Sequence, residues 1–337
     1  PPPSPPPPPP PTPNPPPPNP GPPDKKQTKK KKNTPPPTPP PTPPQNTKHP
    51  TTPAAQKPTD TVRGSALPNA SDQSQPPAGG IGTTSPTYSL YPVLAAIHPA
   101  SLTEIPRNPD TFEPPPAADL AAAWNDAGCA LAFFVNPHAP SGRLESLQYL
   151  EELSDNFRGL LVIDEAYVDF APHNAIPLIQ EGRDNLVLLR SLSKGYALAG
   201  LRFGYAIAHP DRITTLDKAR DSYNTDILSQ VAATAALTHR DAAQQTWQAV
   251  ISERTRLTDA LTDAGWLTWP SHSNFILTQP PDPSPAKAKA IYQDLKANDI
   301  LIRYFNTPGL ADKLRISVGT PDQTTQLLNA LLNTQTP

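Results

Sequence analysis

The sequence predicts an α/β protein with a mostly parallel sheet between helices, a smaller C-terminal α+β domain and a proline-rich N-terminal tail. Two observations carry this prediction. From residue 83 onward, apolar runs of strand length alternate with segments of helical spacing, which is typical of parallel strands joined by helices. Proline is concentrated at the start of the chain, where residues 1–80 hold 32 of the 53 prolines.

The first 80 residues contain only two large apolar side chains, Val62 and Leu67. Two side chains cannot build a core, and proline lacks the backbone donor that sheets and helices need, so residues 1–82 are expected to be a disordered tail. The abrupt change of composition near residues 79–84 also fits an out-of-frame or mis-joined segment. Alternative roles are a polyproline II arm that docks on an aromatic groove, or nucleic-acid binding or nuclear import through the lysine run at 25–32.

The rest of the chain divides into two predicted domains. Residues 83–265 are expected to form the large domain, with strands at 129–135, 160–163, 186–189 and 202–208 and helices at 117–126, 145–156, 211–220 and within 226–264. The pattern of strand-like and helical segments changes in the last third of the chain. Residues 266–337 are expected to form the small domain, with strands at 274–278, 300–303 and 313–318 and helices at 285–298 and 321–332.

Charge and composition argue against several classes of function. Residues 1–80 carry a net charge of +6 and the rest −8, so the folded part would repel phosphate and is not expected to bind nucleic acid. No apolar run of about 18 residues predicts a membrane span, and no signal peptide is visible. The single cysteine, Cys129, cannot form an internal disulfide, which predicts a cytoplasmic protein. The histidines show no metal-ligand spacing, so no metal site is expected.

Four polar motifs follow the predicted strands, at the edge where open α/β sheets bind their ligands. The motifs are Asn-Pro-His-Ala-Pro-Ser-Gly at 136–142, Asp-Glu-Ala-Tyr at 164–167, Ser-Leu-Ser-Lys at 191–194 and Ala-Gly-Leu-Arg-Phe-Gly-Tyr at 199–205. Each motif alone is weak evidence, because a buried Asp is often a helix cap, a Lys is usually solvated and a Tyr usually packs. Together, in this order and spacing, they predict one ligand site.

With these motifs the chain resembles the fold type I aminotransferases, which use pyridoxal 5′-phosphate, and in particular the histidinol-phosphate aminotransferases. The resemblance covers about residues 83–332, including Ser-Pro-Thr-Tyr-Ser-Leu-Tyr-Pro at 85–92 and Leu-Arg-Ile-Ser-Val-Gly-Thr-Pro at 314–321. It implies the pyridoxal-phosphate-dependent transferase fold type I and a homodimer. It also implies transamination between histidinol phosphate and 2-oxoglutarate, giving imidazole-acetol phosphate and glutamate, in L-histidine biosynthesis.

The resemblance assigns roles to individual residues. A transaminase needs an amine that condenses with the cofactor aldehyde and later moves protons, and Lys194 matches that lysine. Asp164 matches the carboxylate that raises the pKa of the pyridine nitrogen and so keeps it protonated. With Tyr167, these residues form the expected catalytic set. The other implied cofactor contacts are Asn136 and Tyr167 at the phenolic oxygen, Tyr88 stacked on the ring, and Ser191, Ser193 and Arg202 at the phosphate.

The implied substrate residues lie in the C-terminal third. Arg315 matches the arginine that binds the substrate α-carboxylate, and Arg303 a second arginine that helps to hold the substrate phosphate. Asn274 matches a position near both cofactor and substrate. The alternative for Arg303 is a surface salt bridge.

The chain also departs from the family pattern. A glycine-rich turn whose amides cradle the cofactor phosphate, and a tyrosine that reaches the partner subunit's cofactor, are not recognisable in residues 1–82. The alternatives are therefore another fold type I enzyme, such as an aromatic aminotransferase or a phosphothreonine decarboxylase, or a non-catalytic, degenerate enzyme body with a proline-rich interaction arm. A substrate panel separates the enzymes, and cofactor titration separates them from the non-catalytic protein.

Overall fold

The computed structural model describes residues 79–98 and 100–333. The predictions for the tail therefore lie outside the described residues, except at its last few positions. There, strand β1 (Gly80–Ser85) begins at Gly80, so the predicted boundary at residue 82 falls inside a strand. Close packing explains the glycines of this strand, because a Cβ on Gly82 would lie 2.8 Å from the ring of Trp124.

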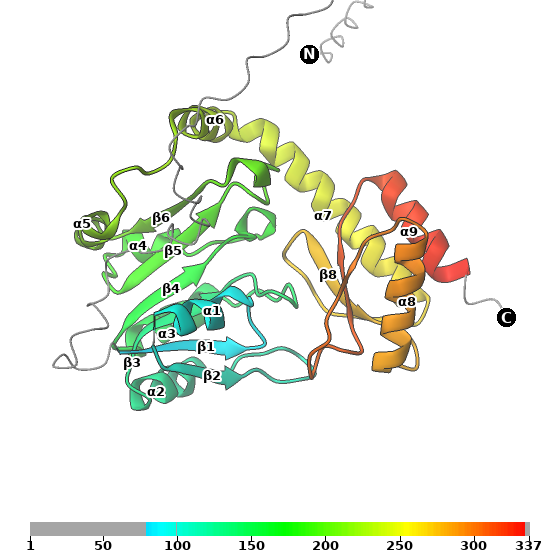
Figure 1. Ribbon diagram of the computed structural model, residues 1–337, viewed down its shortest axis with the longest axis horizontal. Helices are drawn as coiled ribbons and strands as arrows, with labels where there is room; N and C mark the ends of the chain where they lie inside the picture. The colour runs from blue at the N-terminus through cyan, green and yellow to red at the C-terminus, as the bar shows by residue number, and fades with distance from the viewer. Residues whose placement is uncertain (1–78, 99, 334–337) are drawn as a thin grey trace, which may run out of the picture. The chain divides into compact units, whose positions relative to one another are not determined.

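The first sheet has six strands in the order β2-β1-β3-β4-β5-β6 (Figure 1). Its other strands are β2 (Leu102–Pro106), β3 (Cys129–Val135), β4 (Leu160–Asp164), β5 (Leu186–Ser191) and β6 (Gly204–Ala208). Five run parallel and β6 is antiparallel to β5, which confirms the predicted mostly parallel sheet. β6 begins two residues later than predicted, since Arg202 takes a left-handed φ of 55° at the end of the 3₁₀ turn η2 (Ala199–Leu201).

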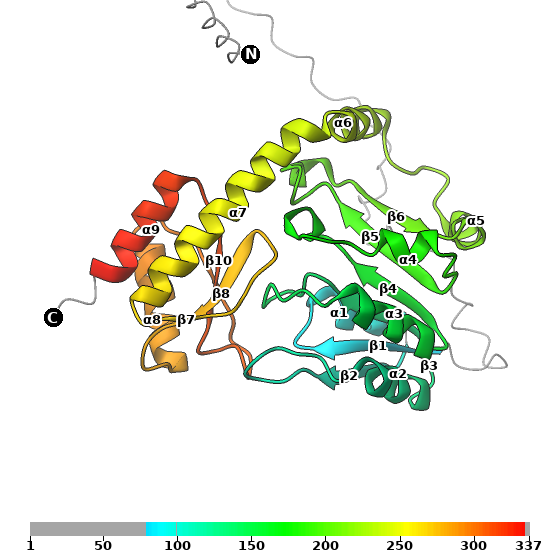
Figure 2. The ribbon, with the colours of Figure 1, turned by 180° about the vertical axis from the view of Figure 1, so that it is seen from behind.

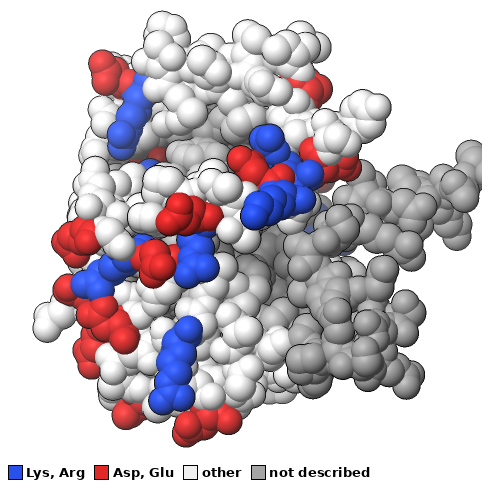
Figure 3. All heavy atoms as spheres, turned by 90° about the vertical axis from the view of Figure 1, so that its left-hand side faces the viewer, with Lys and Arg blue, Asp and Glu red and all other residues white. Residues whose placement is uncertain are grey.

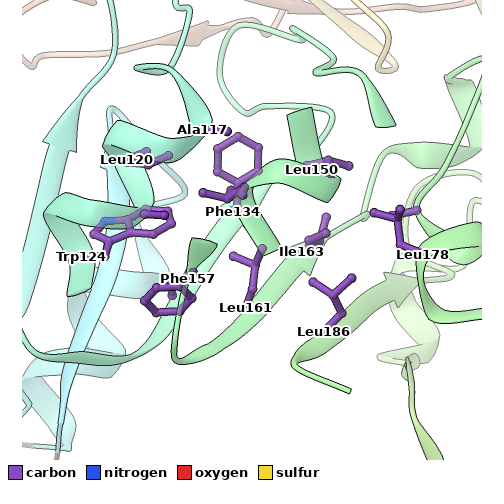
Figure 4. Close-up of a cluster of buried hydrophobic side chains, with 14 of the residues drawn as sticks. Ala117, Leu120, Trp124, Phe134, Leu150, Phe157, Leu161, Ile163, Leu178 and Leu186 are labelled. Atoms are coloured by element: carbon purple, nitrogen blue, oxygen red, sulfur yellow. The ribbon is translucent and has the colours of Figure 1, made fainter. Parts of the chain in front are cut away.

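Helices α2 (Ala117–Asp126), α3 (Leu147–Asn156) and α4 (Ile176–Gln180) cover one face of this sheet. Figure 4 shows Phe134 of β3 pointing between Leu120 of α2 and Leu150 of α3. Side chains alternate along a strand, so Phe133 lies on the other face, where it stacks on Tyr91 of α1 (Leu90–Ile97). Each fully buried Leu or Phe of this core stabilises the fold by about 1.5–3 kcal/mol.

The order of the strands creates a crevice at one edge of the sheet. β1 lies between β2 and β3, and the helix that follows it, α1, lies on the face opposite α2 and α3. Such a reversal of strand order leaves a crevice beyond the carboxyl ends of the neighbouring strands. Those ends are Ser85, Val135 and Asp164, and each is followed by one of the polar segments that the sequence singled out.

A second sheet, antiparallel and in the order β7-β8-β10-β9, forms the C-terminal lobe. Its strands are β7 (Leu267–Thr268), β8 (Phe275–Gln279), β9 (Arg303–Tyr304) and β10 (Leu314–Ser317), so the strand predicted at 300–303 is short and lies later. Helices α8 (Pro285–Ala297) and α9 (Pro321–Asn333) pack on one face. The same core includes Leu257 and Leu261 of α7 (Arg240–Asp263), so the small lobe begins before the predicted boundary at residue 266.

The remaining elements follow β4 or β6 in the chain. They are η1 (Val168–Phe170), α5 (Pro210–Ala219) and α6 (Ile227–Thr238). The helices predicted within 226–264 are α6 and α7, which meet at His239 and run in different directions (Figure 2). Acidic and basic side chains are interleaved on the face in Figure 3. Among the described residues, no helix is both long and apolar enough to cross a bilayer.

Candidate active site

Asp164 ends β4 at the crevice and has both carboxylate oxygens occupied. Its Oδ1 accepts a hydrogen bond from the backbone N–H of Ala166, 2.9 Å away, and its Oδ2 accepts one from the hydroxyl of Tyr91. Burial raises the pKa of Asp164, while the hydrogen bonds from Tyr91 and Ala166 and the charge of Lys194 oppose that rise. The carboxylate is therefore held in one orientation by two fixed donors.

Tyr91 was not identified from the sequence, although it lies within the segment that carries the resemblance. The ring is buried and stacks on Phe133, with ring centres 4.3 Å apart and planes 11° apart. It lies 73 residues from Asp164 along the chain, so only the packing of α1 on β3 reveals the contact. The sole signal in the sequence is that Tyr88 and Tyr91 lie three residues apart, one just before α1 and one in its first turn.

Lys194 lies in the loop between β5 and η2. Its Nζ is 5.5 Å from the centre of the Tyr167 ring. Burial lowers the pKa of the amine, the positive charges of Arg315 and Arg202 lower it further, and Asp164 opposes this. The amine therefore loses its proton at a lower pH than an ordinary lysine, which favours nucleophilic chemistry.

Tyr167 connects the lysine to the second lobe. Its ring meets Phe275 of β8 edge to face, with centres 5.0 Å apart. Burial raises the pKa of its hydroxyl, and the charge of Arg315 opposes this rise. Tyr88 is half exposed and lies edge to face with Tyr91 at 5.8 Å. Aromatic rings thus surround the polar groups of the crevice.

Arg303 and Arg315 are direct neighbours across β9 and β10, whose antiparallel register pairs the two residues. The guanidinium carbon of Arg315 lies 4.7 Å from the ring centre of Phe275 and 5.8 Å from that of Phe305. That of Arg303 lies 5.5 Å from the same Phe305 ring. Phe305 was not identified from the sequence, although it follows Arg303 at the two-residue spacing of a strand face.

Within the described residues, the groups whose charge acts on Arg315 are Tyr167 and Arg303, and no carboxylate is among them. Directly opposed like charges destabilise a sheet, and burial and Arg303 both lower the pKa of Arg315. The Nε of Arg315 is buried and has no hydrogen-bond partner in the part of the chain that the structure describes. A buried donor without an acceptor is costly, so an anionic ligand would stabilise the site.

The other predicted residues take less direct positions. Asn136 follows β3, but its Oδ1 accepts from the backbone N–H of Glu145 at 2.8 Å and its Nδ2 donates to the carbonyl of the same residue at 3.4 Å. Ser191 Oγ accepts from the backbone N–H of Ser193 at 3.0 Å. Exposed Arg202 donates to the carbonyl of Ala199 at 3.1 Å. The backbone carbonyl of Asn274 accepts from the backbone N–H of Val318 at 2.9 Å.

The structure thus joins five of the predicted residues in one chain of contacts and charge interactions. It runs from Asp164 and Lys194 through Tyr167 and Phe275 to Arg315, and on through Phe305 to Arg303. An amine with a lowered pKa, a partly buried carboxylate and nearby guanidiniums and hydroxyls fit an aldehyde that also carries a pyridine nitrogen and a phosphate. Across residues 79–98 and 100–333, no three His, Cys, Asp or Glu side chains are placed to hold a metal ion.

A separate hollow of about 860 Å³ lies between η1 and the start of α7. Asp169, Arg190, Arg240 and Trp247 are among its lining residues, whereas Lys194 is not. Burial raises the pKa of Asp169 to about 6, although Arg190 and Arg240 oppose this. The hollow borders the lysine loop, because Asp169 also lies against Gly195, the residue after Lys194.

The chain matches the family of aminotransferases of class I and II over residues 66–331. It is 44% identical over 246 residues to histidinol-phosphate aminotransferase 1 of Nostoc sp. (strain PCC 7120), and the match covers 73% of this chain and 67% of the relative. A second relative, the histidinol-phosphate aminotransferase of Microcystis aeruginosa, is 40% identical with the same coverage. The matched stretch thus spans about two thirds of each relative.

Solved structures agree with these matches. The crystal structure of histidinol-phosphate aminotransferase from Sinorhizobium meliloti, in complex with pyridoxal-5′-phosphate, superposes with a TM-score of 0.69 at 29% identity, covering 77% of this chain and 71% of that one. These comparisons confirm the resemblance that the four motifs predicted.

Proposed function

This chain belongs to the aminotransferase class I and II family, and we propose that it transfers an amino group between histidinol phosphate and 2-oxoglutarate with pyridoxal 5′-phosphate as its cofactor. The products are imidazole-acetol phosphate and glutamate, and the pathway is L-histidine biosynthesis. The supporting comparisons are the relatives at about 40% identity. The single structural observation that supports the proposal is the position of Arg315, whose charge acts on the amine of Lys194 and whose register partner across the two strands is Arg303.

The two guanidiniums suit the two substrates in turn. Histidinol phosphate carries a phosphate at one end, and glutamate carries two carboxylates, so both substrates bring anions to the same amine. Guanidinium binds phosphate and carboxylate through parallel hydrogen bonds. The buried Nε of Arg315, without a partner among the described residues, is a donor ready for such a group.

The remaining residues hold charge and move protons. Pyridoxal phosphate, when bound, supplies an aldehyde that condenses with amines and a pyridine ring that withdraws electrons. Lys194, with its lowered pKa, would donate its amine and then carry a proton. Asp164, fixed by Tyr91 and Ala166, would hold a protonated ring nitrogen. Arg202, Ser191 and Ser193 would bind the cofactor phosphate, Tyr88 would stack on the ring, and Tyr167 with Asn136 would donate to the phenolic oxygen.

We further propose that two copies of the chain associate through α1. Leu90, Val93 and Ile97 lie three and four residues apart, on one side of this short helix, and 43–54% of each residue's surface is exposed. An exposed apolar stripe of this kind marks an interaction surface. It adjoins Tyr88 and Tyr91, so the association would reach the site. A cytoplasmic location is also proposed, because Cys129 is a buried free thiol, as suits a reducing compartment.

The test is a substrate panel on the protein loaded with pyridoxal phosphate. Histidinol phosphate is expected to be the best amino donor for 2-oxoglutarate, and histidinol, which lacks only the phosphate, serves as the matched control. Preference for phenylalanine would indicate the aromatic aminotransferase alternative, and release of carbon dioxide from phosphothreonine the decarboxylase alternative. A protein that acquires no visible absorbance from the cofactor would be the non-catalytic alternative.

A further inference from the structure

Helix α7 is the one described element that contributes to contacts behind the lysine and also to the core of the second lobe. Its first half carries Trp247, which is buried against the large lobe. Its second half carries Leu257 and Leu261, which belong to the second core. Figures 1 and 2 show the helix running from α6 toward α8 and α9. The helix therefore contacts both halves of the proposed site, the loop that carries Lys194 and the lobe that carries Arg303 and Arg315.

The first contact fixes the residue next to the lysine. The indole Nε1 of Trp247 donates to the carbonyl oxygen of Gly195 at 2.6 Å, and the Tyr196 ring lies edge to face with the indole at 5.4 Å. On the other side, a Cβ on Gly195 would lie 2.2 Å from Oδ2 of Asp169. Gly195 is thus held between Trp247 and Asp169, and only glycine fits there.

The second contact lies seven residues later on the same helix face. The guanidinium of Arg254 donates through Nη1 to the carbonyl of Ser273 at 2.7 Å. Ser273 is fully buried and comes two residues before Phe275, the ring that lies 4.7 Å from the guanidinium carbon of Arg315. Two turns of α7 thus separate Trp247, which contacts the lysine loop, from Arg254, which contacts the segment leading into β8.

From these contacts we infer that α7 sets the spacing between the lysine loop and the arginine strands, with Trp247 and Arg254 as its two positioning residues. Seven residues of α-helix span about 10 Å, and a hydrogen-bonded helix resists stretching. Both anchors end on backbone carbonyls, so they position main chain and not a single flexible side chain. Neither residue touches the reacting atoms. The inference rests on the proposed function, because the spacing matters only if the amine and the guanidiniums act on one substrate.

The alternative is that both contacts merely stabilise the fold. The two interpretations differ in what a variant changes. A structural contact lowers the melting temperature and leaves the environment of Lys194 as it was. A positioning contact also releases the lysine loop, so that the amine becomes better hydrated and its pKa rises toward that of an ordinary lysine.

Trp247→Phe tests the first anchor, because it keeps an aromatic ring and removes the donor. Trp269→Phe is the matched control: that indole is also buried, and its Nε1 donates to the carbonyl of Asp110 at 2.6 Å, away from the lysine loop. For each variant, the rate of cofactor loading is followed by visible absorbance as a function of pH. The midpoint is expected to move to higher pH in Trp247→Phe and to stay unchanged in Trp269→Phe, with kcat lower by roughly ten-fold only in the former.

Arg254→Gln tests the second anchor. It is expected to raise KM for the anionic substrates by roughly ten-fold with a smaller change in kcat, because it loosens the strands that carry the arginines. In the double variant with Trp247→Phe, Arg254→Gln should cause little further change in kcat or KM. Once α7 has lost its contact with the lysine loop, its contact with Ser273 can no longer set the distance between the loop and the arginine strands. Fully additive losses, or an unchanged loading midpoint in Trp247→Phe, would overturn the inference.

Hydrogen exchange keeps this test separate from the proposed function. In the cofactor-free protein, amides of residues 192–198 are expected to exchange faster in Trp247→Phe than in Trp269→Phe at equal melting temperature. If the unaltered protein acquires no cofactor absorbance, the proposed function fails while this measurement still decides whether Trp247 holds the loop. Equal exchange in the two variants would show that it does not.

Discussion

The two halves of the site differ in how completely their polar groups are satisfied. In the large lobe, both oxygens of Asp164 accept hydrogen bonds, and the segment around Lys194 is fixed by Trp247 and by backbone bonds. In the C-terminal lobe, Arg303 and Arg315 lie side by side against aromatic rings, and Arg315 retains a buried donor without an acceptor among the described residues.

This difference indicates a division of labour. Groups that act in every turnover gain from a fixed orientation, because misplaced catalytic groups lose most of their effect. Groups that bind and release a substrate must have donors free when the substrate is absent. The aromatic rings beside the guanidiniums orient them without using up those donors. On the proposed function, the large lobe would carry out the chemistry and the small lobe would bind the substrate, so variants in each should fail in different ways.

The largest effect is expected from Lys194→Ala. Turnover should fall by roughly 10⁴-fold or more and the visible absorbance of the bound cofactor should vanish, because no neighbouring amine replaces it. Lys218→Ala, at an exposed position of α5, is the matched control and should keep both. Retained transamination in Lys194→Ala would show that the chemistry is not centred on this amine.

Arg303→Ala should separate capture from chemistry. Because Arg303 is exposed, we expect binding of phosphorylated substrates to weaken by about 1.5–3 kcal/mol, the strength of hydrogen bonds to a charged group, with much smaller losses for unphosphorylated substrates. The measurement is KM for histidinol phosphate and for an aromatic amino acid, with Arg220→Ala as an exposed control. Equal losses for both substrates would favour a general aminotransferase.

Tyr91→Phe is expected to have a smaller effect on the half of the site that lies in the large lobe. It removes one donor to Asp164 and keeps the ring on Phe133, so kcat should fall with a cost of about 1.5–3 kcal/mol, the strength of a hydrogen bond to a charged group. Tyr149→Phe is the control, since it removes a hydroxyl that donates to the carbonyl of Pro115 at 2.8 Å, away from the site. If both variants lower only the free energy of unfolding and leave kcat unchanged, Tyr91 does not act through Asp164.

The smallest effect is expected from Asp169→Asn, behind the lysine loop. Between the ordinary carboxyl pKa near 4 and about 6, the folded protein holds a proton that the unfolded chain has released, so stability falls as pH rises through this window. Removing the charge should therefore raise the free energy of unfolding by about 1–2 kcal/mol at pH 7, allowing for solvent screening, and not at pH 3. Urea unfolding at both pH values measures this, with Asp184→Asn as an exposed control. A gain of equal size at pH 3 would exclude titration of Asp169 as its cause.

Much of this arrangement could be predicted from the sequence. The apolar runs predicted β3, β4 and β5, because a strand buried on both faces needs few polar side chains. The polar segments after them predicted a site, because parallel strands end at one edge. Lys194 and Asp164 could be picked out from the sequence in this way, because each lies within a few residues of a strand end.

The residues that position these groups were not predictable from local patterns. Tyr91, Trp247 and Phe305 act through contacts with residues far away in the chain, except for Phe305 with Arg303, and nothing in their own neighbourhoods distinguishes them from core aromatics. The short strand β9 was placed too early because two residues of pairing leave almost no periodic signal. Glu145 was predicted as the first residue of a helix, but α3 begins at Leu147 and the backbone of Glu145 instead occupies the amide of Asn136.

The sequence by itself therefore determined the alternation of strands and helices and the edge of the sheet where the polar motifs lie, and it was enough to propose Lys194 and Asp164 as the amine and the carboxylate of the site. Only the tertiary structure decided that Arg303 and Arg315 lie opposite each other, that Tyr91 holds Asp164, and that α7 links the lysine loop to the second lobe. The physical reason is the range of the interactions. Hydrophobic periodicity and strand ends are written in neighbouring residues, whereas strand register and helix packing arise from side chains that meet only once the chain has folded.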